Sequence, residues 1–113
     1  MPMDDMPKIG MPSGALVLLV LRVLRSGPFH GYAMAQRIHT LSSEVLHVEE
    51  GSLYPALQKM LLKGWVRAEW GISETNRKVR FYRLTPDGRK QLEEELSDYK
   101  RVTEAIQNVL RTA

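Results

Sequence analysis

Residues 49–64, with the sequence EEGSLYPALQKMLLKG, decide how this 113-residue chain folds. Large apolar side chains recur in this stretch at intervals of four, three and one residues: Leu53, Leu57, Met60 and Leu61. Such spacing is typical of a helix that buries one face. The stretch therefore predicts a short helix that packs against a core and turns its other face outward.

The expected ends of this helix are marked by particular residues. Ser52 is expected to cap the first turn, because its oxygen can accept a hydrogen bond from an unpaired backbone N–H group. Pro55 is expected within that first turn, where a missing N–H group has little effect. Gly64, which follows Lys63, is typical of the glycine found just after the end of a helix.

The outward face of the same helix carries hydroxyl, amide and ammonium groups: Ser52, Tyr54, Gln58, Lys59 and Lys63. No carboxylate follows Glu50 on this face. These groups suit a helix that contacts the phosphates and base edges of a DNA groove. They also suit an ordinary amphipathic surface helix, so the neighbouring segments have to decide between the two interpretations.

Upstream, the first segment is rich in Met and Pro and has no periodicity, so we expect residues 1–12 to form a flexible arm. Residues 13–26 predict a first helix that is apolar almost all round and ends at the Gly27-Pro28 pair. A helix of this kind is buried on most sides. In a chain this short, it is expected to contact more than its own domain.

A second helix is expected over residues 32–41, and the apolar alternation in residues 42–48 predicts either a buried tether or a brief strand. This segment leads directly into the helix predicted within residues 49–64. Helix, turn, helix, tether and third helix form the skeleton of a helix-turn-helix unit.

After Gly64 the apolar period changes from 3.6 to 2, which predicts a β-hairpin with strands over residues 65–70 and 79–84. A polar loop over residues 71–78 joins the strands. Four cations lie close together in the second half of this hairpin: Arg77, Lys78, Arg80 and Arg83. A hairpin directly after a third helix is a wing, and its cations are expected to contact phosphates. The alternative is a solvated edge strand that its cations protect from pairing.

The last segment begins with Thr85-Pro86, a helix start with an N-cap and a proline in the first helical position. A helix is expected from there to about Arg111, with one apolar stripe: Leu92, Leu96, Tyr99, Val102, Ile106, Val109 and Leu110. A second copy of the helix is the simplest partner for this stripe. The alternative is that the helix folds back on its own domain.

Composition excludes several classes of protein. The chain has no cysteine, and its three histidines are nine and eight residues apart, which does not match a metal-binding pair. No nucleophile motif or phosphate-binding glycine loop occurs, so we expect no enzyme, no cofactor and no metal. The longest apolar run, residues 15–21, is too short to span a membrane. We expect a cytoplasmic protein, and the net charge of +3 is compatible with binding nucleic acid.

A set of short motifs follows in order along residues 16–96: GYAM (31–34), GSLYPAL (51–57), KGWV (63–66), EW (69–70), NRKVRFYRLT (76–85) and Gly88. In this order and spacing they resemble the PadR family of transcriptional regulators. The chain is similar to the short class of that family, which has a single C-terminal helix. The resemblance implies a bacterial homodimer, usually a repressor, that binds a palindromic operator.

The expected fold is mainly helical (α+β): a winged helix-turn-helix domain of three helices and a two-stranded wing over residues 13–84, followed by a dimerisation helix over residues 85–113. By resemblance, the third helix enters the major groove and the wing reaches the backbone or minor groove. The residues expected to contact DNA are Tyr32, Gln36, Ser52, Tyr54, Gln58, Lys59, Lys63, Arg77, Lys78 and Arg80.

The dimer interface is expected to combine the stripe of the C-terminal helix with four residues of the first helix: Leu16, Leu19, Val20 and Val23. Some short members of the family bind flat hydrophobic drugs between tryptophans of the C-terminal helix. Here that helix contains Tyr99 and no tryptophan. Two alternatives to a plain DNA-binding regulator stay open: a sensor with a small hydrophobic effector at the dimer interface, and a protein-interaction module that does not bind DNA.

Overall fold

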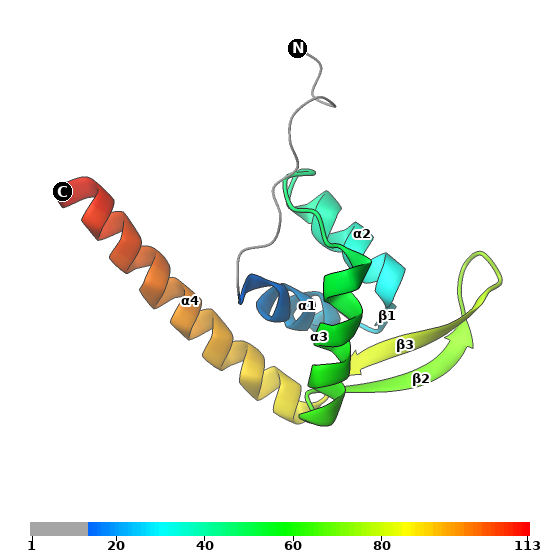
Figure 1. Cartoon of the computed structure of the whole chain (residues 1–113). Helices are drawn as coiled ribbons and strands as arrows, with labels where there is room; N and C mark the ends of the chain where they lie inside the picture. The colour runs from blue at the N-terminus through cyan, green and yellow to red at the C-terminus, as the bar shows by residue number, and fades with distance from the viewer. Residues whose placement is uncertain (1–13) are drawn as a thin grey trace, which may run out of the picture.

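The computed structural model describes residues 14–113, which form four helices and a small antiparallel sheet (Figure 1). The elements are α1 (Ala15–Arg25), β1 (Phe29–His30), α2 (Gly31–Leu41), α3 (Glu50–Leu62), β2 (Val66–Ile72), β3 (Lys78–Leu84) and α4 (Pro86–Thr112). The predicted winged helix with a long C-terminal helix is confirmed. The predicted N-terminal arm, residues 1–12, lies outside the described residues.

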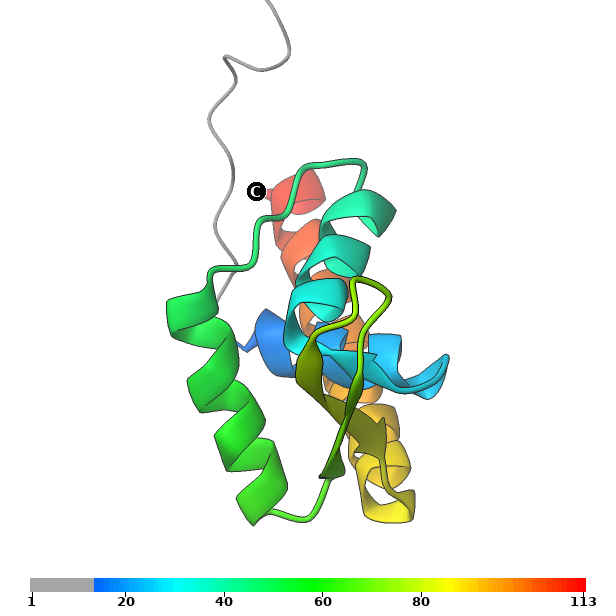
Figure 2. The same ribbon diagram turned by 90° about the vertical axis from the view of Figure 1, so that its right-hand side faces the viewer.

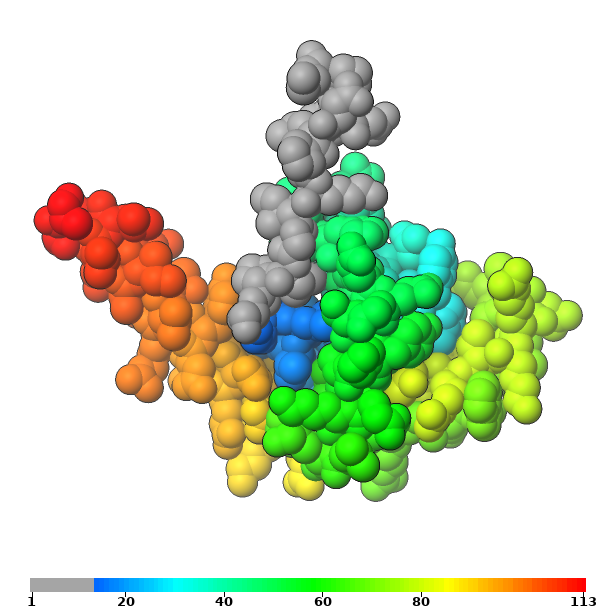
Figure 3. All heavy atoms as spheres, in the orientation of Figure 1, coloured from blue at the N-terminus to red at the C-terminus, as the bar shows by residue number. Residues whose placement is uncertain are grey.

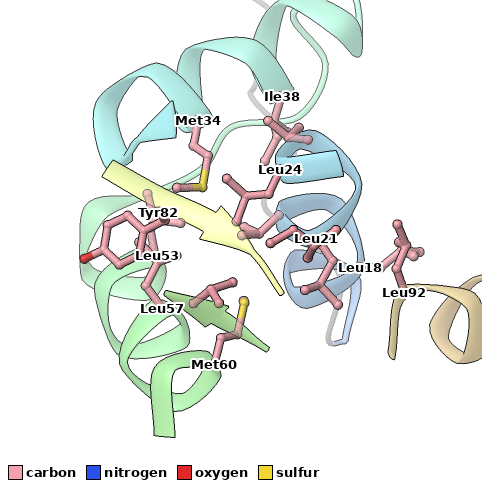
Figure 4. Close-up of a cluster of buried hydrophobic side chains, with 14 of the residues drawn as sticks. Leu18, Leu21, Leu24, Met34, Ile38, Leu53, Leu57, Met60, Tyr82 and Leu92 are labelled. Carbon is pink, nitrogen blue, oxygen red and sulfur yellow. The ribbon is translucent and has the colours of Figure 1, made fainter. Parts of the chain in front are cut away.

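The core is built around α1, which lies between the other helices and the sheet. Figure 4 shows its side chains interleaved with those of α2, α3 and α4. Three α1 residues (Leu18, Leu21 and Leu24) meet Met34 and Ile38 of α2 and the stripe of α3 in one cluster. The prediction that the apolar helix is buried on most sides is therefore correct, and its own domain supplies most of that burial.

The stripe of α3 packs as its spacing predicts, with Leu53, Leu57 and Met60 almost fully buried. The end of α3 is also as predicted, because Gly64 has a positive φ of 75°. Its N–H bonds to the carbonyl of Leu61, and the next N–H bonds to that of Met60. These two bonds are the glycine-dependent helix end known as the Schellman motif.

The predicted start of α3 was wrong. The helix begins at Glu50 and its N-cap is Glu49, whose side chain makes no capping bond. Ser52 therefore lies within the first turn, and Pro55 lies one turn further in than expected. Glu49 has β backbone angles and serves as the N-cap, so the helix starts two residues before the first good capping side chain.

The sheet has three strands in the order β1-β3-β2, and not two as predicted. The strand β1 pairs Phe29 with Tyr82 and His30 with Phe81. A strand of two residues is too short to show a period-2 pattern, and only its pairing with β3 defines it. The wing strands are also longer than expected, so the connecting loop shrinks to residues 73–77.

The junction between the wing and α4 is held by the Thr85 side chain, which is buried. Its hydroxyl accepts a hydrogen bond from the Gly88 N–H (3.0 Å) and donates to the Gly64 carbonyl (2.6 Å). The Thr85 N–H in turn bonds to the carbonyl of Trp65. The predicted N-cap of α4 is thus confirmed, and it also ties α4 to the end of α3.

Beyond this junction, α4 leaves the domain. Only its first turns, with Leu92 and Leu96, pack on the core, and from Tyr99 onward the stripe is exposed. The space-filling view shows the C-terminal half of the helix standing clear of the other elements (Figure 3). The alternative that this helix folds back on its own domain is therefore wrong for its C-terminal half. Within residues 14–113, no helix is both long and apolar enough to cross a membrane.

Candidate nucleic-acid interface

A broad groove of about 1090 Å³ lies between α2, α3 and the wing, on the side that Figure 2 turns toward the viewer. It brings together seven of the ten residues predicted to contact DNA: Tyr32, Gln36, Tyr54, Gln58, Arg77, Lys78 and Arg80. These residues come from three segments that are separated in the chain. Their convergence was not visible in any one motif.

The α2 side of the groove is preorganised by local contacts. The Gln36 amide donates a hydrogen bond to the Tyr32 hydroxyl one helical turn away (2.8 Å). Next to them, the ring of Tyr54 lies directly on the backbone of Gly31, where a Cβ would be only 2.8 Å from the Tyr54 hydroxyl oxygen. Glycine at position 31 therefore lets the side chain of Tyr54 lie between α2 and α3.

The α3 side of the groove carries Glu50, Tyr54 and Gln58, spaced four residues apart along one flank of the helix. Burial raises the pKa of the Tyr54 phenol, and the negative charge of Glu50 raises it further, followed by a contribution from Tyr82. The phenol is therefore neutral at physiological pH. A neutral phenol can donate a hydrogen bond to a phosphate oxygen.

The arrangement of side chains on the wing side of the groove follows from the register between β2 and β3. Trp70 pairs with Arg80 and Ile72 pairs with Lys78, so these four side chains share one face of the hairpin. On that face, Lys78 lies 5.0 Å and Arg80 lies 5.8 Å from the centre of the Trp70 ring. Cations at this distance from an aromatic face are held by its quadrupole, and here they lie along the groove.

Arg83 lies on the opposite face of the hairpin. Its guanidinium donates to the carboxylate of Glu69 at 2.9 Å, with both side chains more than half exposed. An exposed pair of this kind contributes about 0–1 kcal/mol to stability. Of the four cations counted in the sequence, three therefore line the groove and Arg83 does not.

Three predicted contact residues lie outside the groove: Ser52, Lys59 and Lys63. All three are exposed on the other flank of α3. The ammonium group of Lys63 lies 5.1 Å from the centre of the Trp65 ring. The outward surface of α3 thus has two polar flanks, of which only one faces the wing.

The groove also contains residues that were not predicted as contacts: Arg37, Thr40, Glu50, Trp70 and Glu74. The sequence could have identified Arg37 and Trp70 as groove residues, since Arg37 is a cation beside Gln36 and Trp70 lies on the cationic face of the hairpin. It gave no reason to place Glu50 and Glu74 there, because a carboxylate is not expected to contact a phosphate.

The histidines contact the backbone and other rings of the domain. His30 caps α2, where its ring accepts a hydrogen bond from the Ala33 N–H, and its ring meets Phe81 edge-on. The rings of His39 and His47 also meet edge-on, at 6.2 Å. Within the part of the chain that the structure describes, no three His, Cys, Asp or Glu residues are placed to bind a metal ion.

The residues predicted for the dimer interface fall into two groups. Val20, Val23 and Leu92 are already buried in the core of the single chain, and Leu16, Leu19 and Leu96 are partly buried against it. The other five lie on α4 and are more than half exposed: Tyr99, Val102, Ile106, Val109 and Leu110. Apolar side chains that are exposed in a row are typical of an interaction site.

Comparison with known proteins agrees with this architecture. Residues 20–94 match the transcriptional regulator PadR-like family. The crystal structure of a PadR family transcriptional regulator from Eggerthella lenta is similar, with a TM-score of 0.73 and 28% identity over 88% of this chain and 85% of that one.

Two relatives are similar in sequence. Uncharacterized protein X of Lysinibacillus sphaericus is 27% identical over 93 residues, which cover 82% of this chain and 85% of that protein. An uncharacterised 37.1 kDa protein in transposon TN4556 of Streptomyces fradiae is 40% identical over 86 residues, or 76% of this chain. The match spans only 23% of that longer protein.

The family match covers well over half of the chain and includes α2, α3, the wing and the first part of α4. Its members are transcriptional regulators and not enzymes, which agrees with the lack of a catalytic motif in the sequence. The chain belongs to the PadR-like family of transcriptional regulators.

Proposed function

We propose that this regulator binds a palindromic operator in double-stranded DNA as a homodimer and represses transcription from it. The observation that carries the proposal is the groove between α2, α3 and the wing, which gathers polar and cationic side chains from three segments. Regulators of this family bind DNA, typically as dimers, which supports the proposal.

In the proposed complex, α3 enters the major groove and the wing follows the backbone toward the minor groove. Gln58 contacts a base edge, while Tyr32, Gln36 and Tyr54 bind phosphates from the α2 side. Arg77, Lys78 and Arg80 bind phosphates from the wing. The second flank of α3 faces the opposite strand, with Ser52, Lys59 and Lys63.

The proposed dimer forms through the exposed stripe of α4. We assign residues 13–84 to DNA binding and residues 85–113 to dimerisation. A second copy is the partner that fits best, because a two-fold axis lets the same stripe serve both subunits. A dimer also matches the symmetry of a palindromic site, since each recognition helix then contacts one half-site.

Fluorescence anisotropy tests the proposed function directly. The purified chain is titrated onto a labelled duplex from upstream of its own gene and onto a scrambled duplex, at two salt concentrations. We expect tight binding to the upstream duplex alone, weakening as salt increases. Equal and weak binding to both duplexes would contradict the proposal and favour a protein-interaction module.

The wing is tested by the double substitution Arg77→Ala/Arg80→Ala. We expect weaker binding to every DNA sequence, and a plot of log K against log salt that is flatter by roughly one to two units, because each phosphate contact contributes about 0.9. Arg83→Ala is the matched control, since this cation lies on the opposite face and is paired with Glu69. An unchanged slope in the double variant would remove the wing from the interface.

A further inference from the structure

The carboxylate of Glu50 is not explained by phosphate binding. Glu50 is the first residue of α3, is exposed, and lines the groove beside Tyr54. Among the residues that the structure describes, none forms a salt bridge or a hydrogen bond with its carboxylate. A carboxylate in this position repels a phosphate backbone, so a function in DNA binding requires a different partner.

We propose that Glu50 selects cytosine by accepting a hydrogen bond from its exocyclic amino group. The inference rests on the proposed function, in which α3 enters the major groove. The first residues of a recognition helix are the ones that face base edges. An ionised carboxylate can only accept hydrogen bonds, and the N4 amino group of cytosine is a donor that the major groove exposes.

The other bases fit a carboxylate less well. Guanine presents two acceptors in the major groove, and thymine presents an acceptor and a methyl group. Adenine presents a donor beside the acceptor N7. A carboxylate therefore gains a hydrogen bond at cytosine and meets an acceptor at each of the other three bases. The selection comes as much from repulsion as from attraction.

The position of Glu50 separates its base pair from the one assigned to Gln58. The two residues lie on the same flank of α3, eight residues apart. Eight residues of helix span about 12 Å, which corresponds to roughly three or four base pairs when the helix lies along the groove. Substitutions at the two positions should therefore alter the preference at different places in the same half-site.

A purely structural role for Glu50 makes a different prediction. An acidic residue in the first turn interacts favourably with the N-terminal end of the helix dipole. In that case its removal lowers thermal stability and leaves the preferred base unchanged. The base preference at a single position is thus the measurement that separates the two roles.

The experiment uses the full chain and duplexes with a randomised centre. The wild-type protein is first used to select its preferred DNA site. Each position of that site is then replaced by all four base pairs in turn, and the Kd for each duplex is measured. We expect one position per half-site where the wild type prefers cytosine by about 5- to 100-fold. Glu50→Ala should abolish this preference, and Glu50→Gln should shift it toward adenine, whose N6 and N7 groups pair with an amide.

Glu74→Gln provides the matched control, because Glu74 lines the same groove from the wing loop. Removing that charge should strengthen binding to all sequences alike, without changing any base preference. Circular dichroism melting of each variant verifies that it is folded, and Glu50→Gln retains the shape of the side chain in case Glu50→Ala is unstable.

The outcomes distinguish this inference from the proposed function. A wild type that selects a sequence, combined with Glu50 variants that keep every base preference, overturns the role of Glu50 and leaves the regulator intact. A wild type that binds DNA without selecting any sequence overturns both. A cytosine preference lost in Glu50→Ala and moved to adenine in Glu50→Gln supports the inference.

Discussion

Replacing Ile106 with aspartate is expected to convert the proposed dimer into monomers. The Ile106 side chain is 54% exposed in the single chain and lies in the middle of the exposed α4 stripe. In an isologous dimer the substitution occurs twice and places two unpaired carboxylates in an apolar contact. Sedimentation velocity measures the result, with wild-type protein as the dimer reference.

The same variant should also bind operator DNA far more weakly. A monomer cannot bind both half-sites at once, so it loses the increase in affinity that a dimer obtains from doing so. The Kd for a palindromic site is therefore expected to rise by roughly 100-fold or more. Binding to a single half-site should stay near the wild-type value per subunit, because the C-terminal half of α4 lies on the other side of the domain from the wing (Figure 1).

Asn108→Asp is the matched control for this substitution. Asn108 is exposed on the same helix, two residues away, and its side chain accepts a hydrogen bond from Arg111. At about 100° per residue it faces away from the stripe. This variant should remain a dimer. A dimer that persists in Ile106→Asp would mean that another surface joins the subunits.

Replacing Gly88 with alanine is expected to destabilise the fold by about 3 kcal/mol, at the upper end of what overpacking usually causes. A Cβ at position 88 would lie 2.0 Å from the backbone oxygen of Trp65 and 2.7 Å from a methyl group of Leu84. Alanine is the better helix former by about 1 kcal/mol, but that gain is smaller than the expected cost of a contact that no rotamer change can relieve.

Thermal unfolding followed by circular dichroism measures this effect, with an expected drop in Tm of about 10 °C or more. Gly51→Ala is the matched control, because this glycine also lies in a helix and a Cβ there meets nothing within 4 Å. We expect that variant to be as stable as the wild type or slightly more stable. A Gly88→Ala protein with an unchanged Tm would show that α4 can move away from the Trp65 backbone at little cost.

The contact between Gly88 and the Trp65 backbone also affects how the two subunits of the proposed dimer are oriented. The start of α4 is fixed by Thr85, which bonds to the end of α3, and by the close approach of Gly88 to the Trp65 backbone. The direction in which α4 leaves the domain is therefore set at this junction. In the proposed dimer, the same junction sets the distance between the two recognition helices.

Several features were determined by the sequence alone. The buried stripe of α3, its end at Gly64 and the capping of α4 by Thr85 were predicted correctly. Each depends on residues within a few positions along the chain, where helical spacing and the hydrogen bonds of helix ends act locally. The order of the elements, which the changes of apolar period along the chain predict, is also confirmed.

Other features were decided only by the tertiary structure. The strand β1 exists only because it pairs with β3, which lies far along the chain. The faces occupied by Arg80 and Arg83 follow from the register of the hairpin, which a run of cations does not reveal. Packing also decided that Val20 is buried in its own core. Helical spacing and helix capping depend on residues that are close in sequence. Burial and side-chain direction depend on segments that are close in space but distant in sequence.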